Sequence, residues 1–248
     1  MRSIFIKEIN SFFSSIVGYV VLLVFLVFCG IVLWISPSTS ILTYGYATLD
    51  RFFEMAPWLL LLLIPAVTMR SFADEFRGGT IEWLSTKPLS TLDIIMGKYF
   101  AAIMLIVFAL LPTLIYVYTI GNLSAIKNNI DTGSIIGSYI GLLFMAGSFA
   151  SIGIFCSSLT SNQIVGLLLS VFTCVVLYSG FEMLSQLPVF DGGAGYYLGM
   201  VGMSYHYTSI SQGIIDSRDV IYFTSVIILF ISLTRISLGR RTWDTAQQ

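Results

Sequence analysis

The sequence predicts an all-α integral membrane protein with six transmembrane helices, and three observations support this. The 248 residues are 56% hydrophobic and only 10% charged, with a mean hydropathy of +0.90, whereas soluble domains carry about 25% charged residues. Six apolar stretches each approach the roughly 20 residues that a helix needs to cross a bilayer. Charged residues gather between these stretches, most densely in residues 69–99.

The first sixteen residues predict an amphipathic helix ahead of the first span. Phe5, Ile9, Phe12 and Ile16 recur at helical spacing, while Lys7 falls on another face. Such a helix lies in the plane of the inner membrane interface, and Lys7 would point toward anionic headgroups. The alternative is a helix that simply extends the first span.

The spans themselves are predicted from apolar length and sit in one membrane domain covering residues 1–248. Pro57 and Pro65 predict a kink in the second span, which neighbouring helices can tolerate. The fourth span carries small residues four apart, such as Gly137 and Gly141, which let helices approach closely. We expect packing within the chain, with a seam between subunits as the alternative. The predicted spans cover residues 16–35, 53–70, 100–120, 136–157, 163–184 and 219–237.

The distribution of basic residues predicts the orientation of the chain. Six spans place both termini on one side. With that side cytoplasmic, nine Lys and Arg residues lie inside and three outside, as the positive-inside rule requires. Residues 71–98 then form the largest cytoplasmic loop.

This loop contains a pattern typical of a short helix between two breaks. Thr80 can cap the helix, and Ile81, Trp83 and Leu84 give it an apolar patch. Pro88 prevents the helix from continuing, because proline lacks an amide donor. We expect the patch to dock on another protein, since exposed apolar patches mark interaction sites; the alternative is that it folds back on the spans.

The next helix should begin at Ser90 or Thr91, which can accept hydrogen bonds from its first amides. Asp93 suits the first turn of that helix, where the helix dipole favours negative charge.

The outer segment 185–218 contains an apolar stretch too short to span. It therefore predicts a re-entrant or interfacial hairpin, buried in protein or lining a cavity. We expect this segment to act as an outer lid, with Tyr205, His206, Tyr207 and Gly213 as its candidate residues.

Catalytic motifs give no support for an enzyme. The chain has no G-x-x-x-x-G-K-[ST] loop, and its single histidine excludes a His-rich metal site. Ser204 and His206 are neighbours in sequence only, since residues two apart do not face each other on a helix. The spans hold almost no charged residues, which disfavours a proton-coupled carrier. We expect no cofactor in this chain.

Three stretches together resemble a known family. The run "FADEFRGGTIEWLSTKPLSTLDIIMGKYFAA" resembles the signature of ABC-2 type transporter permeases. The runs "KEINSFFSSIVGYVVLLVF" and "YHYTSISQGIIDSRDVIYFTSVI" resemble the first and last spans of the gliding-motility-associated branch of that family. The resemblance covers both ends and the middle of the chain.

The resemblance implies a six-helix ABC-2 exporter fold, with a cytoplasmic coupling helix between spans two and three. A separate ABC ATPase subunit, holding ATP and Mg, would dock on that helix. The extra glycine in "RGGT" would loosen the turn, and Trp83 is bulkier than the usual leucine. The docking residues implied are Asp74, Glu75, Arg77, Gly79, Thr80, Ile81, Glu82, Trp83, Leu84, Thr86, Lys87 and Pro88.

The resemblance also implies partners and a location. A second permease copy or a related permease would complete the transporter, in the bacterial inner membrane, with an accessory protein on the outer loops as a further possibility. Membrane lipid surrounds the chain, and we expect no nucleic-acid partner. A membrane scaffold of a motility or secretion complex is the main alternative function, and a secondary carrier is the third.

Overall fold

The computed structural model describes residues 1–36, 40–41, 48–80, 90–124, 130–190 and 193–245. Within these ranges the secondary structure is entirely helical, which confirms the predicted fold class. Six helical stretches among the described residues are long and apolar enough to cross a membrane, as predicted. They cover Gly18–Ile35, Asp50–Arg77, Thr91–Leu123, Thr132–Leu159, Gln163–Ser185 and Ser217–Gly239.

The N-terminal helix α1 (Arg2–Phe13) is separate from the first span, formed by α2 (Ile16–Gly30) and the π-helical turn η1 (Ile31–Ile35). It is therefore not an extension of that span. Helix α1 packs on α7 (Thr91–Leu110), where a Cβ on Gly97 would lie 3.1 Å from Ile4. The buried residue of α1 is Ile4. Ile16, which was predicted on the apolar face of this helix, is the first residue of α2 and is 81% exposed.

The second span consists of α4 (Asp50–Thr68) and α5 (Arg70–Arg77), which meet at Met69. Both prolines lie inside α4, and the helix break comes after them. Ser157 stabilises this break, because its Oγ accepts from the amides of Phe72 and Ala73 at 3.0 and 3.1 Å and donates to the Met69 carbonyl at 2.9 Å.

The third span runs through α7, the 3₁₀ turn η2 (Leu111–Thr113) and α8 (Leu114–Leu123). Ser90 caps α7: its Oγ accepts from the Asp93 amide at 3.1 Å, and Asp93 Oδ2 accepts from the Ser90 amide at 3.3 Å. This reciprocal pair is a capping box. The predicted helix start is confirmed at Ser90.

Helix α9 (Thr132–Leu159) occupies the centre of the bundle, surrounded by α4, α5, α7, α10, α13 and α14. Its small residues allow this close packing. A Cβ on Gly137 would lie 2.5 Å from the Ile210 carbonyl oxygen, and a Cβ on Gly153 would lie 2.0 Å from Thr68 Oγ1. The small residues therefore serve packing within the chain, as expected.

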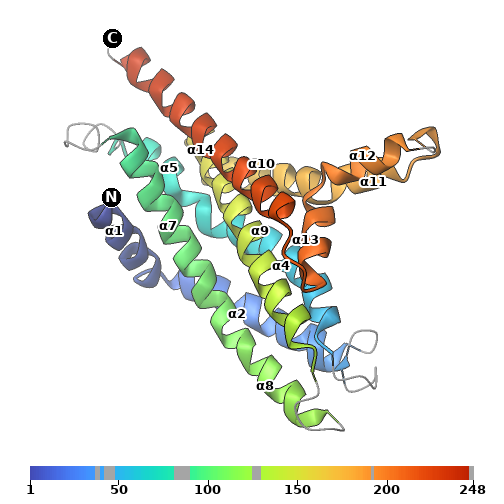
Figure 1. The fold of residues 1–248 in the computed structure, drawn as a ribbon. Helices are drawn as coiled ribbons and strands as arrows, with labels where there is room; N and C mark the ends of the chain where they lie inside the picture. The colour runs from blue at the N-terminus through green and yellow to red at the C-terminus, as the bar shows by residue number, and fades with distance from the viewer. Residues whose placement is uncertain (37–39, 42–47, 81–89, 125–129, 191–192, 246–248) are drawn as a thin grey trace.

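The fifth span combines α10 (Gln163–Val175), the π-helical turn η3 (Val176–Gly180) and α11 (Phe181–Ser185). The 3₁₀ turn η4 (Pro188–Phe190) follows, and then α12 (Ala194–Met200), which packs on α11. Figure 1 shows these two helices as a hairpin that projects sideways from the bundle. Helix α13 (Met203–Ser211) then packs on α9, and α14 (Ser217–Thr245) forms the last span.

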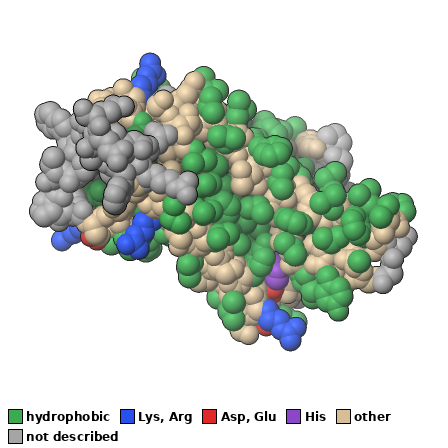
Figure 2. All heavy atoms as spheres, turned by 90° about the horizontal axis from the view of Figure 1, so that it is seen from above, with side chains coloured by type: hydrophobic (Ala, Val, Ile, Leu, Met, Phe, Trp, Pro, Cys, Tyr) green, Lys and Arg blue, Asp and Glu red, His purple; other side chains and the backbone are tan. Residues whose placement is uncertain are grey.

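Both termini lie at one end of the bundle (Figure 1), which we call the terminal end; the other is the opposite end. Figure 2 shows hydrophobic side chains over most of the visible middle of the molecule, with Lys and Arg side chains toward its ends. This is the surface that a bilayer-spanning protein presents, apolar at the level of the hydrocarbon and charged beyond it.

Candidate functional site

The loop predicted to dock an ATPase begins where α5 ends. The Thr80 amide donates to the Glu75 carbonyl at 3.0 Å, and the Gly79 amide donates to the Phe76 carbonyl at 3.3 Å. These two bonds form a Schellman motif. Gly79 has a φ of +65°, a left-handed conformation that glycine adopts without steric cost. The second glycine therefore terminates α5, and a looser turn at this place stays a prediction.

Seven of the predicted docking residues lie outside the described residues: Ile81, Glu82, Trp83, Leu84, Thr86, Lys87 and Pro88. The coupling helix itself thus stays a prediction. The structure describes the two anchors of the loop, which are the end of α5 and the capped start of α7.

Four charged side chains from three helices meet at these anchors, and we call them the base cluster: Lys7 and Glu8 of α1, Glu75 of α5, and Lys98 of α7. Lys98 Nζ lies 2.7 Å from Glu8 Oε1 and 2.9 Å from Glu75 Oε1. It also donates to the Ser71 carbonyl at 2.5 Å. The three donors of the ammonium group therefore all have acceptors, which makes burial of this charge tolerable.

Lys7 completes the base cluster at its exposed edge, with Nζ 2.8 Å from Glu75 Oε1. It pairs with a carboxylate of the chain while its side chain stays 54% exposed, and its direction toward headgroups stays a prediction. Partial burial lowers the pKa of Lys7, but the hydrogen bond to Glu75 and the charges of Glu75 and Glu8 outweigh it and raise the pKa above 10.5. The stabilisation is therefore complete below that value and is lost as pH rises through the raised pKa.

The other predicted acid, Asp74, is exposed and points away from the base cluster. Its carboxylate accepts a hydrogen bond from the side-chain amide of Gln163, the first residue of α10. Arg77 is also exposed. Helix α5 therefore contacts three spans: α7 through Lys98, α9 through Ser157, and α10 through Gln163.

At the opposite end, the predicted lid residues take different roles. Tyr207 is buried and donates to the Phe53 carbonyl at 2.8 Å. His206 Nδ1 lies 2.7 Å from Asp219 Oδ1, its Nε2 lies 2.9 Å from the Met200 carbonyl, and its ring stacks on Tyr222. These contacts attach α13 to α4 and α14.

Gly213 ends the segment with a φ of +85°, and a Cβ there would lie 3.0 Å from the Gly133 carbonyl carbon. Only glycine suits both the left-handed conformation and this close approach to the start of α9.

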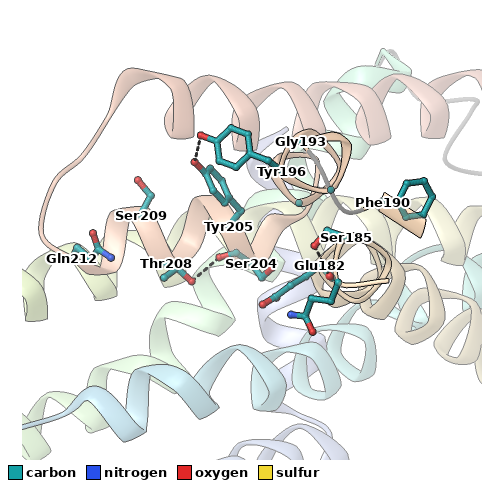
Figure 3. Close-up of a pocket in the computed structure, with 13 residues that line it drawn as sticks. Glu182, Ser185, Phe190, Gly193, Tyr196, Ser204, Tyr205, Thr208, Ser209 and Gln212 are labelled. Atoms are coloured by element: carbon teal, nitrogen blue, oxygen red, sulfur yellow. Dashed lines mark hydrogen bonds between the residues drawn. The ribbon is translucent and has the colours of Figure 1, made fainter. Parts of the chain in front are cut away.

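Tyr205 faces a cavity of about 680 Å³ between α13 and the α11–α12 hairpin. Figure 3 shows Tyr196 and Tyr205 together on one side of this space and Glu182 and Ser185 on the other, with Ser204 between them. The described lining includes no Lys, Arg or His.

Sequence reasoning missed Glu8, Lys98, Ser157 and Gln163 as parts of the terminal end. Lys98 was the detectable one, because a single lysine within an apolar helix must find partners. Lys98 was counted in the cytoplasmic segment 71–98, on the helix expected from Ser90 or Thr91 but just before the predicted span, so no partner was sought for it. Nothing in the sequence pairs it with Glu8, which is 90 positions away.

These features define a class of protein. The described residues form six helices that are long and apolar enough to cross a membrane. Charged side chains and the capped start of α7 lie together at one end. This is the arrangement of a multi-pass membrane protein.

The family follows from comparison with known proteins. Residues 38–190, more than half of the chain, match the ABC-2 family transporter protein model. The chain belongs to this family, and so is a transmembrane permease component of an ABC transporter. Membership implies an ABC ATPase subunit as partner. No curated protein matches the chain.

Proposed function

We propose that this permease couples ATP hydrolysis by a separate ATPase subunit to export, and that residues 81–89 receive the force. The observation that carries the proposal is the fixation of both anchors of that segment. A Schellman motif ends α5 at Gly79, a capping box starts α7 at Ser90, and the base cluster joins the two helices. A displacement of the loop therefore moves two spans together.

The proposed cycle begins when ATP, with Mg in the ATPase, brings two ATPase subunits together. The apolar patch of the permease, formed by Ile81, Trp83 and Leu84, is bound to the ATPase surface and moves with it. Helices α5 and α7 pass the displacement to α9 and α10 through Ser157 and Gln163. Asp74 and Arg77 are exposed in the last turns of α5, where they suit charged contacts with the ATPase.

The proposal places the terminal end in the cytoplasm of a bacterial cell, with the chain in the inner membrane. The nine basic residues on that side, against three on the other, support this orientation. A second permease, identical or related, would complete the transporter. The segment formed by α12 and α13 would be the outer lid of the transporter, and an accessory protein could bind to it.

A scaffold in gliding or secretion machinery is the second candidate function. The sequence likeness to the gliding-associated branch favours it. The two functions differ in one measurement on the chain reconstituted with its ATPase. Stimulation of ATP hydrolysis by a candidate substrate supports transport, whereas stable association without stimulation supports a scaffold.

The docking step is tested with Trp83→Ala. Large aromatic side chains contribute most to interface energy, so the variant should weaken ATPase association by about 2 kcal/mol, roughly thirtyfold. The measurement is the dissociation constant of the purified permease and ATPase. Tyr118→Ala is the matched control, because Tyr118 is an exposed aromatic residue of α8 in the third span. Full ATPase association and full transport by Trp83→Ala would contradict the proposal.

A further inference from the structure

Arg70, the first residue of α5, lies in a crevice at the terminal end that the base cluster does not fill. The crevice has a volume of about 70 Å³ and is lined by α1, α2, α7 and the junction of α4 with α5. This is several times the roughly 10–15 Å³ that one water needs. Ser11, Ser15, Glu8 and Lys98 also line it.

The guanidinium group of Arg70 is poorly satisfied in this position. Its Nη1 donates to Ser15 Oγ at 3.4 Å, and its Nε is buried without a hydrogen-bond partner. None of the ion pairs formed by the described residues includes Arg70. Asp74, one turn further along α5, bonds to Gln163 instead. A guanidinium group has five N–H donors, so most of its capacity is unused.

The surrounding charges leave Arg70 uncompensated. The base cluster contains two lysines and two glutamates and is neutral by itself. Arg70 therefore adds one net positive charge to the crevice. A partly buried charge without a partner is costly, so the crevice as a whole favours an anion.

The position of the crevice identifies the kind of anion. It is lined by Gly18, the residue at which the first span begins, so it lies at the level of the lipid headgroups. Helices α1 and α2 run along one edge of the bundle (Figure 1), and the first span is only 22% buried. Basic pockets between transmembrane helices bind phospholipid headgroups, and guanidinium groups bind phosphate through two parallel hydrogen bonds.

We propose that Arg70, with the hydroxyl groups of Ser11 and Ser15, binds the phosphate of an anionic phospholipid at the terminal end. The lipid then bridges α1, α2 and α5 beside the base cluster. This site is independent of the docking of an ATPase and of the orientation of the chain.

The test measures binding of phosphatidylglycerol to the purified full chain in detergent, by native mass spectrometry. Arg70→Gln should weaken binding at least about tenfold, the loss expected for a charge-assisted pair of hydrogen bonds. Arg70→Lys should be intermediate, because it keeps the charge and loses the forked geometry. Arg77→Gln is the matched control, since it removes one exposed charge from the same helix and should leave binding unchanged.

Two further probes decide whether lipid is the source of the phosphate. Diacylglycerol, which lacks the phosphate, should not be retained. Glycerol 3-phosphate, which lacks acyl chains, should bind far more weakly than phosphatidylglycerol. Retention of either probe to the same extent as phosphatidylglycerol would overturn the assignment, as would equal losses in Arg70→Gln and Arg77→Gln.

Thermal unfolding separates binding from folding. Phosphatidylglycerol should raise the melting temperature of the wild-type chain, because a ligand that binds the folded state stabilises that state. It should not raise the melting temperature of Arg70→Gln, which has lost the binding site. Without lipid, Arg70→Gln should melt no lower than wild type, since it removes an uncompensated charge. A lower melting temperature in lipid-free detergent would show that the chain already compensates Arg70 and would contradict the proposal.

Discussion

Lys98 is the residue on which the terminal end depends most. It lies about two turns into α7, its side chain is 1% exposed, and its Nζ is 4.9 Å from the centre of the Phe72 ring. The ammonium group thus has two carboxylates, a carbonyl and an aromatic face around it. Burial of both signs of charge holds α1, α5 and α7 in one arrangement, because any other leaves a charge unpaired.

The residue-scale prediction is that Lys98→Met destabilises the chain by about 3–5 kcal/mol, because Glu8 and Glu75 lose their shared buried partner. The measurement is unfolding in detergent followed by tryptophan fluorescence. Lys7→Met makes the same chemical change at the exposed edge of the base cluster and should cost at most about 1 kcal/mol. Equal effects of the two variants would refute the buried-charge argument.

At the scale of elements, the packing of α13 on α9 depends on the absence of a side chain at Gly137. A Cβ there would also lie 2.9 Å from the Gly213 Cα. Both close neighbours are backbone atoms of the segment that follows α12, so a side chain cannot be accommodated by a change of rotamer. Helix α13 must then move away from α9.

The element-scale prediction is that Gly137→Ala costs about 1–3 kcal/mol of stability, as overpacking does in well-filled interiors. The specific readout is hydrogen exchange of the α13 amides, residues 203–211, which should become faster. Gly180→Ala is the control, because its nearest neighbour would be 3.6 Å away. Unchanged exchange in Gly137→Ala would show that α13 does not depend on this contact.

The helices themselves were largely predictable, and the contacts between them were not. Apolar length gave the six spans, and the local pattern at Ser90 and Asp93 gave the capping box, because both depend on neighbours in sequence. The break at Met69 depends on Ser157, 88 positions away. The base cluster depends on which faces of α1 and α7 meet. Single-sequence periodicity holds no information on such long-range pairs.

The acids at the end of α5 were predictable from the sequence, but their contacts were not. Asp74 and Glu75 were both predicted as docking residues, but adjacent residues on a helix face different directions. Glu75 turns inward to Lys98, while Asp74 turns toward Gln163. Only the three-dimensional arrangement separates a structural acid from an exposed one.

At the scale of the whole molecule, the orientation of the chain can be tested with single cysteines. The native Cys29, Cys156 and Cys174 are free and buried, so they should react slowly with an impermeant maleimide. With the terminal end cytoplasmic, Thr132→Cys should be labelled in intact spheroplasts, and Ser3→Cys only after permeabilisation. Both positions are exposed, so accessibility to reagent is matched. The opposite labelling pattern would reverse the proposed topology.

The central place of α9 has one more consequence. In an apolar 18-residue stretch of the span Thr132–Leu159, 78% of the residues are buried. Among the described residues, this helix occupies the axis of the bundle and six other helices surround it. A conduit along that axis would require α9 to leave it. The first, fifth and sixth spans instead face outward from the bundle, since only 22%, 28% and 17% of the residues in their apolar 18-residue stretches are buried.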